Sequence, residues 1–294
     1  MFRRFLLAFF GLLTALAAVA AWAPLAVLSA VTPATGLREI HGIAYGEHPR
    51  HRLDVAAPVE PSRGRPVVVF FYGGAWQEGD RAQYRFVSRS LAARGWVTVV
   101  PDYRVHPEAR FPDFLQDSAA AVRWARDHAA EHGGDPTRLF LMGHSAGAYN
   151  AAMLALDARW LRGAGLDPAR DVRGWIGLSG PYDFLPIVDS VVQTVFGPRE
   201  RWPATQPIAY VSTGSPPALL FTGEADERVR PGNSVRLAAA LRAVKAPVRL
   251  ITFPGAGHVR TLMALWPWSA GDVRVLEAVT AFIREWSPPP DGGG

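Results

Sequence analysis

Cysteine is absent from all 294 residues of the chain. This absence excludes disulfide bonds, thiolate metal ligands and a cysteine nucleophile. It is compatible with an oxidising compartment but does not by itself demonstrate one. If the protein is an enzyme with a nucleophilic side chain, that side chain must belong to another residue type.

Lysine is nearly absent as well, because Lys245 is the only one and arginine supplies the other positive charges. The formal net charge is +5 and the isoelectric point is about 9.9, a balance that can accompany binding to nucleic acid or anionic membranes. No run of five or six basic residues occurs, since the arginines are scattered among Asp and Glu. We therefore expect no nucleic-acid partner. Apolar residues make up 49% of the chain, enough to bury a sizeable core.

A largely apolar stretch without charge runs from Phe5 to Val31 and follows Arg3 and Arg4. About 20 apolar residues suffice to cross a bilayer as a helix. A secretory signal has a shorter apolar region followed by small residues, and the sequence Ala-Val-Ala ending at Ala20 supplies such a cleavage site. Residues 1–36 are therefore expected to be an uncleaved membrane anchor or a signal peptide. Both alternatives place the remaining chain on the periplasmic or extracellular side. A helix packed on the domain is the less favoured alternative, because no polar face interrupts the run.

Short apolar strands alternate with helices through residues 37–286. The strands are expected at 38–45, 51–56, 66–71, 96–100, 138–142, 174–178, 218–221 and 248–253. The helices are expected at 81–94, 111–132, 146–156, 235–244 and 273–286. This alternation predicts one α/β domain, with a mostly parallel central sheet, helices on both faces and the first two strands as an antiparallel edge. The long segment 181–217 interrupts the alternation and is expected to form a small lid. The proline- and glycine-rich residues 287–294 are predicted to be a disordered tail.

A G-x-S-x-G sequence, Gly143-His144-Ser145-Ala146-Gly147, lies between an expected strand and an expected helix. In that context the turn lifts the serine hydroxyl above the carboxyl edge of a sheet, and glycines are needed because larger side chains would clash in so sharp a turn. We therefore predict that Ser145 is a nucleophile, the alternative being a glycine-rich structural turn.

A serine hydroxyl needs a base, and the base needs an acid to orient it. His258 follows the last expected strand in a glycine-rich loop, where the sites of α/β sheets gather, so we predict that it is the base. The acid is expected after the preceding strand, where Asp226 is the first candidate and Glu224 the second. The chain order Ser, Asp, His is the order expected of this fold.

The negative oxygen of a tetrahedral intermediate needs backbone donors. One is expected from Ala146, directly after the nucleophile, and others from the glycine-containing loop Tyr72-Gly73-Gly74-Ala75-Trp76. Trp76, Tyr149 and the aromatic residues of the segment 181–217 are expected to form an apolar substrate pocket. No metal or cofactor is implied by these residues.

Five motifs in order carry a resemblance to a known superfamily, namely FFYGGAWQEGDR, VPDYR, GHSAGAYN, TGEAD and GAGH. Over residues 38–286 the chain resembles the α/β-hydrolases, in particular the esterase and lipase branch that contains hormone-sensitive-lipase-like enzymes, feruloyl-esterase-type carboxylesterases and kynurenine formamidases. The resemblance implies that Gly74 and Ala75 supply the remaining oxyanion donors. It also shows a departure, because those families have histidine where this chain has Tyr72, and this changes the hydrogen bonding available inside the loop.

The function expected from the motifs is hydrolysis of a carboxylic ester through a Ser145-His258-Asp226 triad, with a small-molecule ester as the partner. An arylformamidase or other amide hydrolase with the same triad is the first alternative. A binding module of the same fold without catalysis is the second, and it is disfavoured because every triad position is filled. No feature of the sequence indicates the oligomeric state.

Overall fold

The computed structural model describes residues 24–269 and 274–287, and its central feature is one eight-stranded sheet. The strands are β1 (Leu37–Ala44), β2 (Arg52–Pro58), β3 (Arg65–Phe71), β4 (Val97–Pro101), β5 (Gly134–His144), β6 (Gly174–Leu178), β7 (Ala218–Gly223) and β8 (Val248–Phe253). Their order in the sheet is β1-β2-β4-β3-β5-β6-β7-β8. The pairs β1–β2 and β2–β4 are antiparallel, and all other neighbours are parallel. The predicted mostly parallel sheet with an antiparallel leading edge is confirmed.

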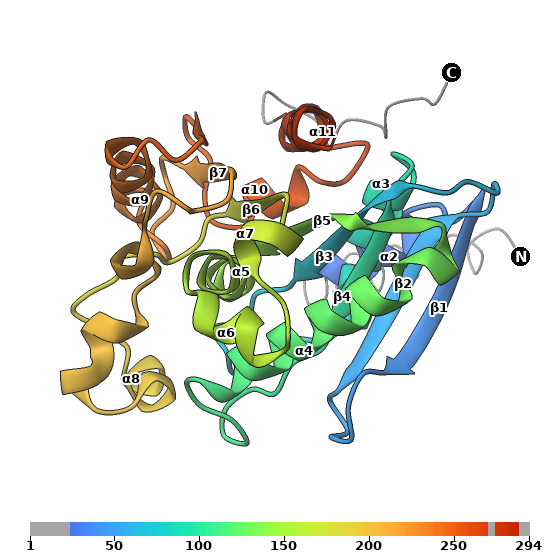
Figure 1. The fold of residues 1–294 in the computed structure, drawn as a ribbon. Coiled ribbons are helices and arrows are strands. Elements are labelled where there is room, and N and C mark those ends of the chain that lie inside the picture. The colour runs from blue at the N-terminus through green and yellow to red at the C-terminus, as the bar shows by residue number, and fades with distance from the viewer. Residues whose placement is uncertain (1–23, 270–273, 288–294) are drawn as a thin grey trace, which may run out of the picture.

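Helices cover both faces of this sheet, with α4, α5 and α6 on one face and α2, α3 and α11 on the other (Figure 1). The α-helices are α2 (Pro24–Val31), α3 (Arg85–Ala92), α4 (Asp113–His128), α5 (Ala146–Leu156), α6 (Ala158–Gly163), α7 (Pro168–Asp171), α8 (Ser190–Phe196), α9 (Gly232–Ala243), α10 (Arg260–Met263) and α11 (Val275–Trp286). The 3-10 turns are η1 (Arg81–Tyr84), η2 (Ala129–His132), η3 (Arg199–Thr205) and η4 (Pro207–Tyr210). The expected helices at 81–94 and 111–132 each combine an α-helix with a 3-10 turn.

The core lies where the central strands pass between the two helical layers. Residues 67–71 of β3 and 139–142 of β5 are almost completely inaccessible to solvent, and β3 pairs with β5 and β4 in parallel. Strands buried on both faces need apolar side chains in both alternating directions, which explains their continuous apolar sequences. The sheet therefore holds the ends of β5, β7 and β8 rigidly in place, and these ends carry the candidate site.

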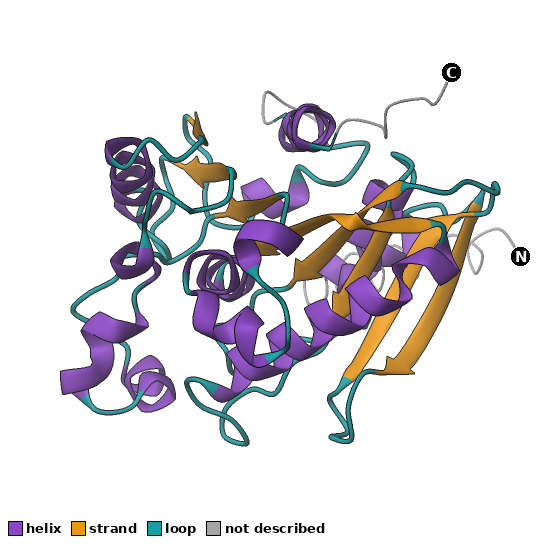
Figure 2. Cartoon of the chain, viewed as in Figure 1, coloured by secondary structure: helices purple, strands orange, loops and turns teal. Residues whose placement is uncertain are grey.

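The segment 181–217 contains α8, η3 and η4 and extends beyond the sheet edge (Figure 2). Buried amide side chains anchor it: Gln206 Oε1 accepts a hydrogen bond from the Phe184 amide at 2.8 Å, and Asn233 Oδ1 accepts one from the Tyr182 amide at 3.0 Å. The segment supplies one wall of the cavity described below, which agrees with the expected lid position.

Helix α2 forms the end of the apolar stretch that begins at Phe5, and it packs on the domain. Ser29 Oγ donates a hydrogen bond to the Gln83 carbonyl at 2.8 Å. Arg89 Nη1 donates to the carbonyls of Ser29 at 2.6 Å and Thr32 at 2.9 Å. Residues 24–32 therefore pack on the domain, which was the less favoured alternative for the apolar stretch as a whole. They can do so because these hydrogen bonds satisfy the polar groups at the end of the helix.

The remaining predictions for the termini concern residues outside the described ranges. The structure does not describe residues 1–23, which contain the expected anchor or the cleavage site at Ala20. It also does not describe residues 288–294 of the expected tail. Ser287, the first residue of that tail, is described and buried, and it accepts a hydrogen bond from Arg138. Within residues 24–269 and 274–287, no helix combines the length and apolar character needed to cross a membrane.

Candidate active site

Ser145 occupies a sharp turn between β5 and α5. Its backbone angles are φ 55° and ψ −123°, in a region that residues with a side chain rarely adopt. A Cβ atom on Gly143 would lie 2.2 Å from the Gly147 carbonyl oxygen, and one on Gly147 would lie 2.0 Å from the Phe71 carbonyl oxygen. Both flanking glycines are therefore required by close backbone approach, as the motif predicts. The Ser145 amide donates to the Leu178 carbonyl at 2.9 Å, which ties the turn to the end of β6.

Three predicted residues lie in one hydrogen-bonded series across the ends of β5, β7 and β8. His258 Nε2 lies 2.9 Å from Ser145 Oγ, and His258 Nδ1 lies 2.8 Å from Asp226 Oδ2. Because an ionised carboxylate only accepts hydrogen bonds, Nδ1 carries the proton and Nε2 is free to accept the one from serine. An imidazole held in this way can act as a general base toward the serine hydroxyl.

The acid of this series is Asp226 and not Glu224. Asp226 is 3% exposed, and its second carboxylate oxygen accepts hydrogen bonds from the amides of Arg228 at 3.0 Å and Val229 at 2.9 Å. Burial raises the pKa of Asp226, but the hydrogen bonds from His258 and Val229 outweigh burial and bring the pKa below its ordinary value. Asp226 is therefore ionised at neutral pH. Glu224 is exposed to solvent.

His144, the residue before the nucleophile, supports the loop that carries His258. Its Nε2 lies 3.1 Å from the His258 carbonyl oxygen, so this nitrogen must be the donor. Burial, and after it the charge of neighbouring His258, lowers the pKa of His144 to about 3. His144 is therefore neutral at physiological pH and acts as a fixed hydrogen-bond donor.

The residues expected to bind an oxyanion lie beside Ser145. Gly74, Ala75 and Ala146 all line the same cavity as the nucleophile. Ala146 is the first residue of α5, so its amide has no acceptor within the helix. Gly74 has φ 127°, and a Cβ atom there would lie 2.1 Å from the Glu78 carbonyl oxygen, so the loop can turn at this position only with glycine. The loop turns back on itself through hydrogen bonds from the amides of residues 77 and 78 to the Gly74 carbonyl.

Tyr72 anchors this loop from below, at the position where related families have histidine. Its hydroxyl donates to Asp102 Oδ1 at 2.8 Å and accepts from Arg50 Nη2 at 2.9 Å. The same Arg50 nitrogen donates to the Gly79 carbonyl at 2.9 Å, at the far end of the loop. Asp102 is also paired with Arg81. Tyr72, Arg50 and Asp102 therefore form a hydrogen-bonded network that connects both ends of this loop.

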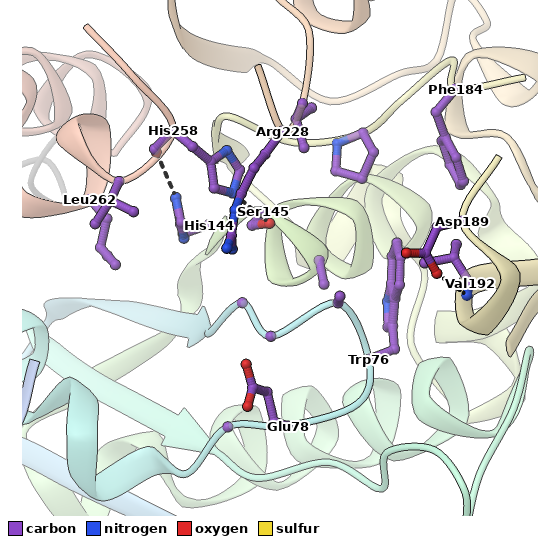
Figure 3. A pocket seen from close by; sticks show the side chains of 18 of the residues that line it. Trp76, Glu78, His144, Ser145, Phe184, Asp189, Val192, Arg228, His258 and Leu262 are labelled. Carbon is purple, nitrogen blue, oxygen red and sulfur yellow. Dashed lines mark hydrogen bonds between the residues drawn. The ribbon is translucent and has the colours of Figure 1, made fainter. Parts of the chain in front are cut away.

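A cavity of about 820 Å³ opens over Ser145. Trp76 lines it together with Phe184 and Val192 of the lid segment (Figure 3). Ile187 of the same segment also lines the cavity. The indole is fixed from behind by a hydrogen bond from Nε1 to Asn150 Oδ1 at 3.1 Å. These four side chains form an apolar surface next to the Asp189 carboxylate, and this surface suits an apolar acyl or aryl group.

The predicted contact between Tyr149 and substrate is corrected by the structure. Tyr149 is completely buried, does not line the cavity and donates its hydroxyl proton to the Thr205 carbonyl at 2.7 Å. Its ring meets that of Trp76 edge to face, with centroids 5.1 Å apart. Because Tyr149 lies on the inward face of α5, it supports Trp76 and does not face the cavity.

Sequence reasoning missed three contributors to the site: His144, Arg50 and Asn150. His144 was visible in the motif, but nothing in the sequence indicates that it contacts the loop of His258. Arg50 lies in the turn before β2 and carries no motif, and Asn150 lies on a helix whose other residues are apolar. Their partners lie 114, 22 and 74 residues away in the chain, so only folding brings them together.

The sheet order, the serine at the turn after β5, and the aspartate and histidine after β7 and β8 define an α/β-hydrolase of the carboxylesterase and lipase type. More particularly, the chain belongs to the BD-FAE family, whose sequence model matches residues 53–241.

The chain is similar to several curated esterases. Isoprenylcysteine alpha-carbonyl methylesterase ICME of Arabidopsis thaliana is 29% identical over 262 residues, which are 82% of this chain and 61% of that protein. Esterase LipC of Mycobacterium tuberculosis is 34% identical over 236 residues, which are 74% of this chain and 58% of that protein. The chain therefore matches about three fifths of the length of these relatives.

Solved structures give the same fold. A truncated carbohydrate esterase from gut microbiota superposes with a TM-score of 0.75 at 22% identity, covering 85% of this chain and 96% of the other, which is evidence for the fold alone. The esterase Est2 of the Planctomycetes species Thermogutta terrifontis superposes with a TM-score of 0.69 at 26% identity, covering 88% of this chain and 96% of the other.

Proposed function

We propose that this protein is a serine carboxylesterase that hydrolyses carboxylic esters through an acyl-enzyme. The observation that carries this proposal is the hydrogen-bonded series from Ser145 Oγ through His258 to the buried Asp226, at the floor of an open cavity. The names of the curated relatives, which are esterases, support the same reaction class.

In the proposed mechanism Ser145 Oγ attacks the ester carbonyl carbon while His258 Nε2 takes the hydroxyl proton. The negative oxygen accepts hydrogen bonds from the amides of Ala146, Gly74 and Ala75. When the bond to the leaving oxygen breaks, His258 gives its proton to that oxygen and the alcohol departs. Water then attacks the acyl-enzyme with the same base and releases the acid. The ionised Asp226 stabilises the histidine while it is positively charged.

The apolar wall formed by Trp76, Phe184 and Val192 supports an apolar acyl group as the preferred substrate part. The structurally similar Thermogutta terrifontis esterase 2 has been solved phosphonylated by sarin, so a fluorophosphonate is a suitable probe of the nucleophile. The alternative amide activity uses the same catalytic residues and differs only in substrate, so substrate kinetics must distinguish the two activities.

The test is labelling with a fluorophosphonate probe, followed by kinetics on p-nitrophenyl esters of increasing acyl length and on N-formylkynurenine. We expect labelling that Ser145→Ala abolishes, together with ester hydrolysis that also requires Ser145. Hydrolysis of the formamide without hydrolysis of any ester would replace the carboxylesterase with an arylformamidase. If Ser145 does not react with the probe in the folded protein, the non-catalytic binding module is the remaining alternative.

We also propose that residues 1–23 direct the protein to the membrane or through it, with the catalytic domain on the periplasmic or extracellular side. The charge-free stretch after Arg3 and Arg4 supports this proposal. The mass of the mature protein decides between the two forms. A mass short by about 20 residues indicates a cleaved signal, and the full mass in the membrane fraction indicates an anchor. Full-length protein in the soluble fraction contradicts both.

A further inference from the structure

Among residues 24–269 and 274–287, four charged side chains line the catalytic cavity, and two of them serve local structure. Asp80 Oδ1 accepts a hydrogen bond from the Ala82 amide at 2.7 Å and caps η1. Asp189 Oδ1 accepts hydrogen bonds from the amides of residues 191 and 192, both at 2.9 Å, and caps α8. The other two are Glu78 and Arg228. Within the described part of the chain, neither side chain has a hydrogen bond or an ion pair.

Arg228 differs in this respect from many arginines of the same protein. Arg81, Arg104 and Arg159, for example, each pair with an aspartate. Arg228 follows Asp226 by two residues, and its amide is fixed by a hydrogen bond to the Asp226 carboxylate. Its side chain, in contrast, extends into the cavity toward Ser145 and His144 (Figure 3). Its charge acts on the cavity floor, because after burial and His258 it contributes to the low pKa of His144.

Arg228 lies on the side of the cavity where the alcohol part of an ester substrate would bind. The oxygen that leaves must come within hydrogen-bond reach of His258 Nε2 to receive its proton, so the alcohol part of the ester lies on the His258 side of Ser145. Arg228 is on that side, and the apolar wall of Trp76, Phe184 and Val192 is on the other (Figure 3). Glu78 lies across the cavity from Arg228, on the loop after β3 (Figure 3).

We infer that Arg228 is a specificity residue that binds an anionic oxygen group, a carboxylate or a phosphate-like group, on the alcohol part of the ester substrate. This inference rests on the proposed esterase function and extends it to a substrate class. A guanidinium presents paired N–H donors that match the two oxygens of such a group. Arg228 is a solvent-accessible arginine that lines the cavity, and because its side chain has no carboxylate partner among the described residues, its donors are available for a ligand. The substrate class is therefore an ester with an apolar acyl chain and a negatively charged alcohol.

The test compares matched esters of one acyl chain. The three substrates are 4-carboxyphenyl butyrate, its uncharged analogue 4-carbamoylphenyl butyrate, and 4-(phosphonomethyl)phenyl butyrate, the last of which distinguishes a phosphate-like group from a carboxylate. The quantity measured is the ratio of kcat/KM for the charged ester to that for the uncharged ester. Because the ratio is taken within one variant, a general loss of activity cancels.

We expect Arg228→Gln to lower this ratio about tenfold or more for at least one charged ester, as for loss of a charge-assisted hydrogen bond. The matched control is Arg230→Gln, because Arg230 is an arginine of the same loop that is exposed like Arg228 but does not line the cavity. Glu78→Gln should raise the ratio, because it removes the opposing negative charge.

Two negative results are distinguishable. If the uncharged ester is hydrolysed by a Ser145-dependent reaction but the ratio falls equally in Arg228→Gln and Arg230→Gln, or in neither, the inference about Arg228 is wrong and the esterase stands. If no ester is hydrolysed and Ser145 is not labelled by the fluorophosphonate, the proposed function itself is wrong.

Discussion

The neutral, buried His144 makes a specific contribution to the dependence of stability on pH. In the unfolded chain a histidine binds a proton below about pH 6.5, whereas in the folded protein burial lowers the pKa of His144 to about 3. Between these two values the unfolded state binds more protons than the folded state, so the free energy of unfolding falls as the pH falls. The contribution is fully present above about pH 6.5 and is lost progressively toward pH 3.

The size of the effect follows from the shift. One pKa unit corresponds to about 1.4 kcal/mol, so His144 should lower the free energy of unfolding by about 3 kcal/mol between about pH 7.5 and 4.5. The substitution His144→Gln removes the titration and keeps an amide donor for the His258 carbonyl. We therefore expect the wild type to lose about 3 kcal/mol more than this variant over that interval, whatever the difference between them at neutral pH.

Urea denaturation followed by tryptophan fluorescence, at a series of pH values, measures this difference. His106→Gln serves as a control, because it replaces a histidine that is only partly buried and lies outside the candidate site. If the wild type and His144→Gln lose stability in parallel as the pH falls, His144 is not held neutral by burial and the reasoning is refuted.

Three further substitutions test the site. Ser145→Gly should raise the free energy of unfolding by about 1–2 kcal/mol while abolishing hydrolysis, because glycine tolerates a φ of 55°. Ser145→Ala is the comparison, because alanine also removes the hydroxyl but does not relieve the strain. Equal stability of the two variants would argue against strain at this position. Tyr72→Phe should lower the free energy of unfolding by about 1–3 kcal/mol, because Asp102 and Arg50 each lose a hydrogen-bond partner. It should also slow fluorophosphonate labelling, because the oxyanion loop loses its anchor. An unchanged labelling rate would show that the Tyr72 network does not position this loop. Asp226→Asn should lower kcat by about 10⁴ by allowing the wrong histidine tautomer, and a loss under tenfold would contradict the assigned role.

Much of the fold was predictable because the main signals are local. Continuous apolar runs such as residues 66–71 indicate strands buried on both faces, and glycine or proline marks their ends. The boundaries were less predictable. β5 begins at Gly134, four residues before the expected start, because Gly134 pairs with Arg65 of β3, a contact between residues far apart in the chain. The short helices α6, α7 and α10 carry too few residues for a period to be recognised.

The candidate site was predictable only in part. The residue types and their order indicated Ser145, His258 and an acid after β7, because an α/β-hydrolase places these residues in this chain order on loops at one sheet edge. Sequence reasoning assigned Tyr149 to the pocket because an aromatic residue close to the nucleophile is typical of a substrate wall. A helix exposes its residues on different faces, however, and Tyr149 lies on the face that turns inward, against the Thr205 carbonyl.

The sequence by itself determined the α/β alternation, the turn that requires glycine at 143 and 147, and the candidate nucleophile and base. Tertiary structure decided between Asp226 and Glu224, since residues two positions apart share every local signal and only one of them reaches the ring of His258. Tertiary structure also decided how Tyr72 holds the oxyanion loop and that His144 donates to the His258 carbonyl. The physical reason is common to these cases. A hydrogen bond between distant residues depends on where the sheet places their backbones, and no local pattern records that position.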